Sequence, residues 1–232
     1  LWSKNYYPED KDHYYYKCPE CLESDINGRS DRTIQLDRVQ SLDWEGVFLS
    51  PIHPEVNNYL TSLFIQIINT YSFDGIFLDN IRYQNHYFGY NIKGIEKFRE
   101  EYDINPLDIN RGIISKKYGY TDIQVDSIKV LWNEYRISKV SELIYMLNQY
   151  IDANDTLNIE VVALGKSNPR ESKEKWFQDW SAWLVNPSLL DFIIIENYNK
   201  NLYEFMYHND RVINNLNNID INKIIVGLST HL

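Results

Sequence analysis

The residues that first suggest chemistry are Asp79, Asn80 and Arg82, which lie together in the stretch YSFDGIFLDNIRYQ (71–84). They follow a short run of mostly apolar residues that is typical of a buried strand. Burying an unpaired charge is costly, so charged residues directly after such a strand are usually surface caps or parts of a site. In a site, a carboxyl group can donate or accept a proton, and neighbouring amide and guanidinium groups can bind a polar substrate. The end of this strand is therefore the first candidate site.

The elements that would position this site follow from hydrophobic periodicity. Residues 53–71 predict a helix, because Pro54 and Glu55 suit a first turn and the apolar residues that follow recur at helical spacing. His53 is interpreted as a residue of the helix start. Further helical or mixed segments are predicted at 128–151, 171–185 and 202–216. Apolar runs predict strands at 75–83, 157–164, 189–198 and 223–228.

This alternation of helices with apolar strands predicts a parallel sheet covered by helices on both faces. Both a barrel and an open doubly wound sheet fit the pattern. The predicted strands end in polar residues, namely Asp79 and Asn80, Lys166 and Ser167, Glu196 and Asn197, and Ser229 and His231. Sites in both folds lie at the carboxyl ends of strands. No GxGxxG or GxxxxGK[ST] loop follows a strand, so nucleotide-binding folds are disfavoured and the barrel is favoured.

Charge and composition exclude two classes of protein. The formal net charge is −10 and no cluster of Lys and Arg interrupts it, whereas nucleic-acid binding depends on such clusters. The longest apolar runs fall short of the ~20 residues that span a bilayer, so no transmembrane segment is predicted in this chain. Aromatic residues form 15% of the sequence and either fill the core or offer faces on which sugars stack. The chain opens at LWSKNYYP without Met, so we expect a processed or trimmed product.

Cys18 and Cys21 form the single CxxC motif of the sequence. A structural zinc site requires four ligands, and no second CxxC or HxxxH motif completes one here. A redox CxxC is typical between a strand and a helix start, whereas this motif lies in a polar, loop-like region (1–41). The sequence therefore predicts no metal site, and it leaves the role of the two cysteines open.

Several motifs, in order, resemble the glycosyl-hydrolase-like family ten. LSPIHPEVNNYLTSLFIQIINTYSFDGIFLDNIRY (49–83) is similar to that family's PEVR helix start followed by its DGIHLDyxRYP strand. Further matches are CPECLESDINGRS (18–30), WNEYRISKVSELI (132–144) and FQDWSAWLVNPSLLDFIIIENY (177–198). The resemblance covers nearly the whole chain. Four positions depart from it: Cys18 and Cys21 replace a His and a Trp, Asn80 replaces a second acid of many relatives, and Glu196 falls near a usual Met or Pro.

The resemblance implies a (β/α)8 TIM barrel that acts on or binds polysaccharide, with no metal or organic cofactor required. Leu1 and Trp2 would end the third barrel strand, and the four predicted strands would be strands four to seven. We therefore expect an incomplete view of a longer protein, in which residues 1–232 form one partial barrel domain. A Tyr- and Asn-rich insertion at about 85–125 would hold short helices near 91–102 and 106–118.

The resemblance also suggests where the protein acts and on what. Some relatives are cell-envelope proteins that cut peptidoglycan-type glycans. We therefore expect a secreted, periplasmic or cell-surface protein, with a lipid anchor ahead of Leu1 as one option. Its expected partner is a polysaccharide or oligosaccharide.

Glycoside cleavage requires two carboxyl groups flanking the bond, ~5–5.5 Å apart in retaining and ~6.5–9.5 Å apart in inverting enzymes. Asp79 is the first candidate, because an apolar wall at the strand mouth would suit acid catalysis; pairing with Arg82 is the alternative reading. Glu196 is the natural second carboxyl, or else the partner of a nearby cation. Glu160, inside the apolar NIEVVAL, is expected to be buried and to serve as the second acid or to tune Asp79.

Polar and aromatic residues near these carboxyl groups are the predicted sugar contacts, namely Asn80, Arg82, Tyr83, Asn197, Tyr198 and Trp180. For Trp180, core packing is the alternative. The leading hypothesis is a glycoside hydrolase, and the rival is a non-catalytic carbohydrate-binding barrel of the cell envelope. A facing pair of carboxyl groups would support the enzyme. Asp79 locked by Arg82, with no facing acid, would support the binding protein.

Overall fold

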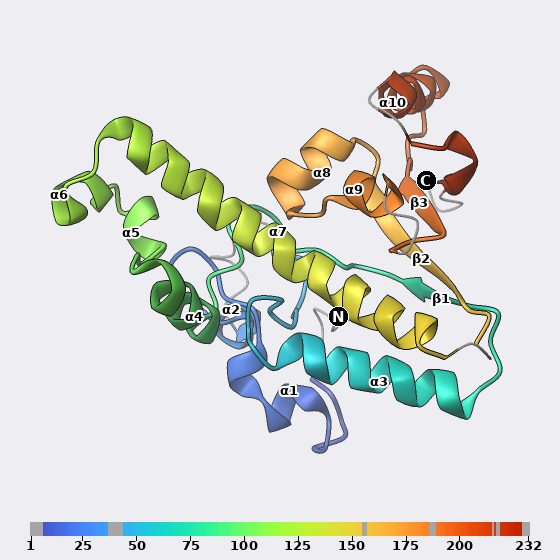
Figure 1. Cartoon of the computed structure of the whole chain (residues 1–232), viewed down its shortest axis with the longest axis horizontal. Coiled ribbons are helices and arrows are strands. Elements are labelled where there is room, and N and C mark those ends of the chain that lie inside the picture. The colour runs from blue at the N-terminus through green and yellow to red at the C-terminus, as the bar shows by residue number, and fades with distance from the viewer. Residues whose placement is uncertain are drawn as a thin grey trace. The chain divides into compact units, whose positions relative to one another are not determined.

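A computed structural model describes residues 7–36, 44–154, 157–185, 189–214, 216 and 219–228 (Figure 1). Leu1, Trp2, Ser229 and His231, which the sequence analysis assigns to strand ends, lie outside these residues. Within them the protein is a mixed α/β protein. In this part of the chain no helix is long and apolar enough to cross a membrane.

The chain divides into two compact units. Unit 1 comprises Leu1–Tyr59 and Tyr83–Lys139, and unit 2 comprises Leu60–Arg82 and Val140–Leu232. Two long helices, α3 (Val56–Thr70) and α7 (Asp122–Asp152), contribute residues to both units. The organisation of residues 1–232 as one barrel domain stays a prediction.

Unit 2 contains a four-stranded parallel sheet, as the sequence predicts. The strands β1 (Gly75–Leu78), β2 (Glu160–Lys166), β3 (Phe192–Glu196) and β4 (Ile224–Gly227) lie side by side in chain order. The first strand ends earlier than predicted because Asn80 adopts a left-handed conformation, with φ of 54°. The sheet is compatible with part of a TIM barrel, although the described strands do not close into one.

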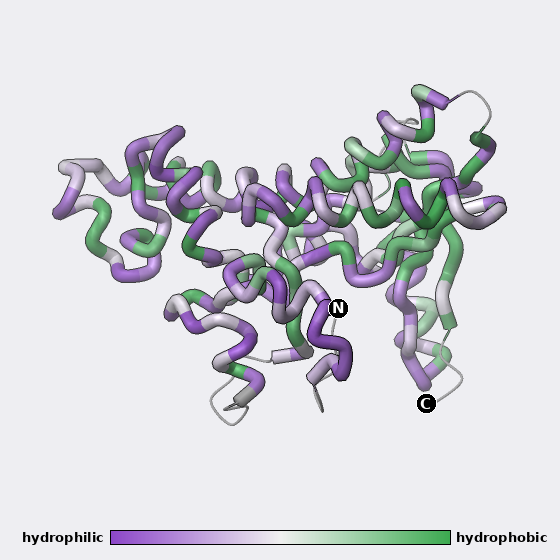
Figure 2. The backbone as a smooth tube through the Cα atoms, turned by 90° about the horizontal axis from the view of Figure 1, so that it is seen from below, coloured by the Kyte–Doolittle hydropathy of each residue, from purple (hydrophilic) through white to green (hydrophobic). Residues whose placement is uncertain are grey.

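The sheet has one buried and one open face, because side chains alternate along each strand. The buried face is formed by Ile76, Leu78, Val161, Ala163, Ile193 and Ile195. Trp180 packs against this face so closely that a Cβ on Gly165 would lie 2.9 Å from its ring. On the opposite face Phe77 and Ile225 expose 51% and 45% of their surfaces. The strands are the most continuously hydrophobic part of the backbone in Figure 2.

Helices follow β2 and β3. The predicted segment 171–185 is two helices, α8 (Pro169–Trp176) and α9 (Trp180–Val185), because Phe177 ends α8 in a left-handed conformation with φ of 52°. The predicted helix 202–216 is α10 (Leu202–Asn214), and a short 3-10 helix, η3 (Ile221–Lys223), precedes β4. The indole of Trp183 in α9 donates a hydrogen bond of 2.8 Å to Ser141 Oγ in α7. This bond fixes α9 against the second half of α7.

Unit 1 consists of short helices, loops and the first half of α7. Its helices are α1 (Tyr14–Lys17), η1 (Pro19–Cys21), α2 (Asp31–Leu36), α4 (Ile92–Tyr102), α5 (Leu107–Asn110) and α6 (Ile114–Tyr118). The predicted helix near 91–102 is confirmed. The one near 106–118 is broken in two at Gly112, whose φ of 65° interrupts the helix. The region predicted as loop-like holds three of these short helices, since each is too short to show helical periodicity.

Asp31 and Glu23 are among the carboxyl groups that lie fully buried in unit 1. Asp31 accepts hydrogen bonds from the side chains of Gln84 and Trp44, at 2.9 and 3.1 Å. Glu23 accepts one from Ser50 Oγ at 3.2 Å. Burial raises the pKa of Glu23 to about 7 and raises the pKa of Asp31 well above its ordinary value, because burial penalises the charged form. Both groups therefore favour the protonated state within the folded chain.

Candidate functional site

Three charged side chains gather at the carboxyl ends of the strands in unit 2. Asp79 directly follows β1, Lys166 ends β2 and Glu196 ends β3. The register pairs Lys166 with Glu196, and the alternation of side chains puts both on the open face with Asp79. Sites in parallel α/β folds form at this end of the strands. The structure thus brings two of the predicted carboxyl groups to one edge of the sheet.

Lys166 holds Glu196 in an ion pair. The Nζ of Lys166 lies 2.5 Å from Oε2 of Glu196, and the two side chains expose only 21% and 18% of their surfaces. The same ammonium lies 5.3 Å from the ring centroid of Trp176, at the end of α8. A charge-assisted hydrogen bond and a cation–π contact together fix the position of the lysine. The ion pair with Lys166 therefore fixes the position of the Glu196 carboxylate.

Tyr198 links the two carboxyl groups electrostatically. It follows β3, and 44% of its surface is exposed. Its pKa is raised first by partial burial and then by the negative charges of Glu196 and Asp79. Both carboxylates thus lie close enough to act on one phenol. The sequence analysis placed Tyr198 among the sugar contacts, and its position beside this edge agrees with that role.

Asp79 differs from its predicted surroundings. Its side chain is exposed rather than set in an apolar wall, so that expectation is wrong. Within the described ranges it forms no hydrogen bond or ion pair with another side chain. Arg82 is buried, and its Nη2 donates a 3.2 Å hydrogen bond to Oδ1 of Asn80 instead. Asp79 is therefore not locked by Arg82, which removes the arrangement that would have favoured the binding protein.

The side chain of Gln178 links the carboxyl ends of β1 and β2. Its Nε2 donates to the carbonyls of Ile81 and Leu164, at 3.0 and 2.9 Å. Its Oε1 accepts from the backbone N–H of Lys166 at 3.2 Å and from the hydroxyl of Ser172 at 3.0 Å. The side chain is fully buried; three of the four bonds anchor the segments that carry Asp79 and Lys166, and the fourth joins Gln178 to α8. Gln178 therefore positions the strand ends that carry Asp79 and Lys166.

Two predicted site residues lie away from this edge. Glu160 is exposed at the amino end of β2, paired in register with Gly75, so the expectation of a buried second acid is wrong. The reason is that β2 begins at Glu160 rather than running through it. Trp180 is fully buried, and its Nε1 donates to the carbonyl of Lys166 at 2.9 Å. It is a core residue and offers no face to a sugar.

Asn197 and Tyr83 are also used inside the protein. Asn197 is buried, and its Nδ2 donates to the carbonyl of Phe205 and to Oδ1 of Asn209, at 2.9 and 2.8 Å. These bonds tie the end of β3 to α10. Tyr83 is fully buried in unit 1, where its hydroxyl donates to the carbonyl of Arg136 at 3.3 Å. Neither side chain is available as a sugar contact in this structure.

The sequence analysis missed Lys166, Trp176 and Gln178 as members of the site. Lys166 was visible as a polar residue at a strand end, but its pairing with Glu196 depends on the register of β2 with β3. Gln178 stands in the FQDW motif, yet its four bonds reach residues between 6 and 97 positions away. No local pattern reveals such partners.

The parallel sheet and the charged residues at its carboxyl edge define a mixed α/β protein compatible with part of a TIM-barrel-like glycosidase. The chain belongs to the family Glycosyl hydrolase-like 10, whose model matches residues 29–231. Comparison with curated proteins gives no match. The resemblance drawn from the sequence is thus confirmed. Membership suggests a glycosidase-related function and a carbohydrate partner.

Proposed function

We propose that this protein is a glycoside hydrolase that cleaves a polysaccharide, with Asp79 and Glu196 as its carboxyl pair. The observation that carries the proposal is the position of both carboxyl groups on the open face at the carboxyl edge of one parallel sheet. The family supports the reaction class. The substrate class, a peptidoglycan-type or other β-linked glycan, comes from the resemblance, as does a location in the cell envelope or outside the cell.

The two carboxyl groups are suited to different roles. Glu196 is held in place by its ion pair with Lys166, and we assign it the role of base or nucleophile. Asp79 is exposed on the open face, where a bound glycan can reach it, and we assign it the role of proton donor. This division follows the general logic of glycosidases, in which one carboxyl group protonates and the other attacks or activates water.

Aromatic side chains beside the pair provide a surface for sugar rings. Tyr198 exposes 44% of its surface, and Trp176 is half-buried against Lys166. Stacking on such rings holds a sugar while the polar groups act on its hydroxyls and its glycosidic oxygen. We propose these two, rather than Trp180, as the stacking platform.

Release of reducing ends from β-linked glycans, including peptide-free peptidoglycan strands, tests the proposal. The complete protein is compared with Asp79→Asn and Glu196→Gln, and binding to the same glycans is measured in parallel. Glu160→Gln is the matched control, because Glu160 is an exposed carboxylate at the opposite end of the same sheet. We expect each site variant to lose at least ~100-fold in kcat while binding is retained, and the control to stay active. Binding without cleavage by the unmodified protein would instead identify a carbohydrate-binding barrel.

A further inference from the structure

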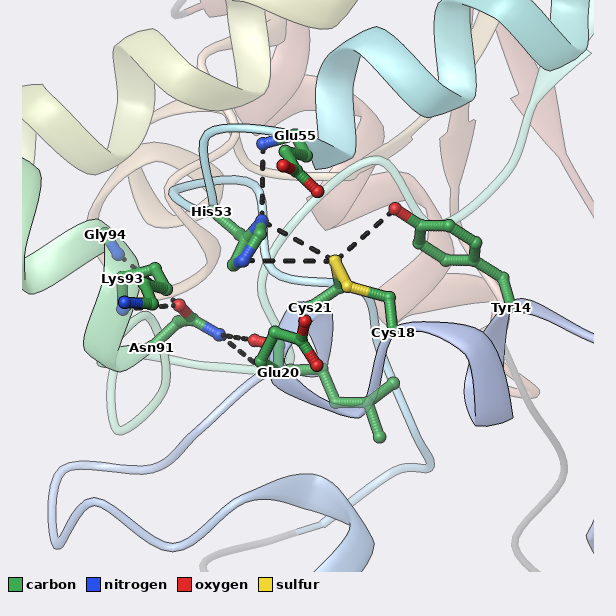
Figure 3. The surroundings of a disulfide bond; sticks show 10 residues. Tyr14, Cys18, Glu20, Cys21, His53, Glu55, Asn91, Lys93 and Gly94 are labelled. Carbon is green, nitrogen blue, oxygen red and sulfur yellow. Dashed lines mark hydrogen bonds between the residues drawn. A yellow bond between two sulfur atoms is a disulfide. The ribbon is translucent and has the colours of Figure 1, made fainter.

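The CxxC motif, which the proposed function does not use, lies in a buried cluster of side chains in unit 1. Cys18 and Cys21 form a disulfide, and Cys21 is completely buried. Figure 3 shows the ring of His53 and the hydroxyl of Tyr14 facing the sulfur of Cys21 from different sides. The Tyr14 hydroxyl lies 3.4 Å from that sulfur. This cluster therefore brings together two sulfurs, an imidazole and a phenol.

His53 is the ligand that the sequence does not reveal. It lies 32 positions after Cys21, three residues before α3 begins, and only 4% of its surface is exposed. Its Nδ1 and Nε2 lie 3.6 and 3.9 Å from Cys21 Sγ. The backbone N–H of Glu55 points at Nδ1 from 3.3 Å, which assigns a lone pair to that nitrogen. A ring nitrogen with a lone pair has the form that binds a metal ion, and zinc at Nδ1 would replace the Glu55 N–H as its partner.

We propose that, when the Cys18–Cys21 disulfide is reduced, Cys18, Cys21 and His53 bind one zinc ion. One ligand atom from each of the three residues lies within 4.8 Å of the others. Zinc–ligand distances of ~2.0–2.3 Å place the ligands of a tetrahedral site roughly 3.3–3.8 Å apart, so small movements suffice. Two thiolates and an imidazole form the soft donor set that zinc prefers. Three protein ligands leave the fourth position to water.

The disulfide and the zinc site exclude each other, because the same sulfur atoms form both. Reduction by a phosphine transfers two electrons and two protons to the disulfide, giving two thiols, while the phosphine takes an oxygen atom from water and becomes a phosphine oxide. Each thiol then loses its proton as it binds zinc, so two protons are released per ion. The occupancy of the site therefore depends on the redox state of the chain.

The two states tie the chain together differently. The disulfide joins residues only three positions apart, so it links no distant segments. Zinc would join this loop to His53, and closing a longer loop removes more conformational entropy from the unfolded chain. Zinc should therefore stabilise the reduced chain against unfolding more than the disulfide stabilises the oxidised chain.

Titration of the full-length chain with Co²⁺ and then Zn²⁺, without oxygen and after phosphine reduction, tests the proposal. We expect one Co²⁺ per reduced chain, with the near-ultraviolet absorption of sulfur-to-cobalt charge transfer, displaced by one Zn²⁺. The oxidised chain should bind neither ion at this site. His53→Ala should weaken Zn²⁺ binding at least ~10-fold, and His53→Cys should restore it by supplying a third thiolate. His86→Ala, at an exposed histidine of unit 1, is the matched control and should bind as the unmodified chain does.

Circular dichroism of each variant separates loss of a ligand from loss of folding. The proposal is overturned if the folded, reduced chain shows no sulfur-to-cobalt absorption. It is equally overturned if folded His53→Ala binds Zn²⁺ with unchanged affinity, or if the disulfide resists reduction in the folded chain. Cleavage of glycans does not enter this test, so its outcome is independent of the proposed function.

Discussion

The Nζ of Lys166 lies 2.5 Å from Oε2 of Glu196, and each residue is the last of its own strand. The pairing of β2 with β3 sets these two residues directly opposite each other. A cation and a carboxylate that meet at the edge of a parallel sheet are held by the backbone and not only by their mutual attraction. The position of Glu196 relative to Asp79 is therefore a property of the sheet register.

Replacing Lys166 tests whether this ion pair supports catalysis. Lys166→Met removes the cation that pairs with Glu196, and we expect kcat to fall roughly 100-fold. Lys166→Arg keeps the charge and should recover part of the activity. Initial rates of reducing-end release measure both. A rise in KM alone, with kcat unchanged, would show that the lysine acts on sugar binding instead.

The stereochemistry of cleavage follows from the strand order. β1 and β3 flank β2, so their backbones lie roughly 10 Å apart, closer to the wide carboxyl separation of inverting glycosidases than to the narrow one. We expect inversion at the anomeric carbon. Proton NMR of the product, recorded before its anomers equilibrate, identifies the first anomer formed. The retained anomer would require the two side chains to approach each other when substrate binds.

Gln178 is expected to stabilise the folded chain as well as to position the strand ends. Gln178→Leu leaves the carbonyls of Ile81 and Leu164 and the N–H of Lys166 without this partner, and we expect a loss of about 2–4 kcal/mol in the free energy of unfolding. Urea denaturation measures it. Gln149→Leu, at an exposed position, should change that free energy by less than ~0.5 kcal/mol. Equal effects of the two substitutions would contradict the anchoring role.

The raised pKa of Glu23 predicts how the stability of the chain depends on pH. Its pKa is about 7 in the folded chain against an ordinary value of 4.5, mainly because of burial. Between these values the folded state binds more protons than the unfolded state, so the free energy of unfolding falls as pH rises. Asp31, whose pKa is also raised, adds to the same trend. The contribution is fully present below pH 4.5 and is lost as pH passes about 7.

Glu23→Gln is expected to flatten this dependence, because an amide does not titrate. Urea denaturation at a series of pH values between about 4 and 8 measures the slope for both chains. Glu9→Gln, an exposed carboxyl in the same unit, should leave the slope unchanged. An identical slope in Glu23→Gln would mean that Glu23 titrates normally in the folded chain.

The sequence was a good guide to local elements and to strand ends. Asp79 was placed correctly after β1, because an apolar run followed by charges marks the end of a buried strand. Glu196 was placed correctly for the same reason. Such patterns are local, since each depends on residues within a few positions of one another.

Long-range packing decided what the sequence could not show. Glu160 lies within an apolar run and was predicted to be buried, yet the strand begins at Glu160 and leaves it exposed. The sequence allows Trp180 to be either a stacking surface for sugars or a core residue, and its close approach to Gly165 shows that it is a core residue. His53 was predicted at a helix start, whereas α3 begins three residues later, and only folding brings His53 to Cys21. In each case the deciding contact joins segments distant in sequence.

Asn91 lies between the CxxC loop and α4 in unit 1 (Figure 3). Its Nδ2 donates to the carbonyls of Glu20 and Leu22, at 2.6 and 2.8 Å, while its Oδ1 accepts from the backbone N–H groups of Lys93 and Gly94, at 3.0 and 3.4 Å. Opening of the loop would pull this amide from the helix start and leave those N–H groups without their cap. The loop and the first turn of α4 should therefore exchange their amide hydrogens with solvent together, as one cooperative unit.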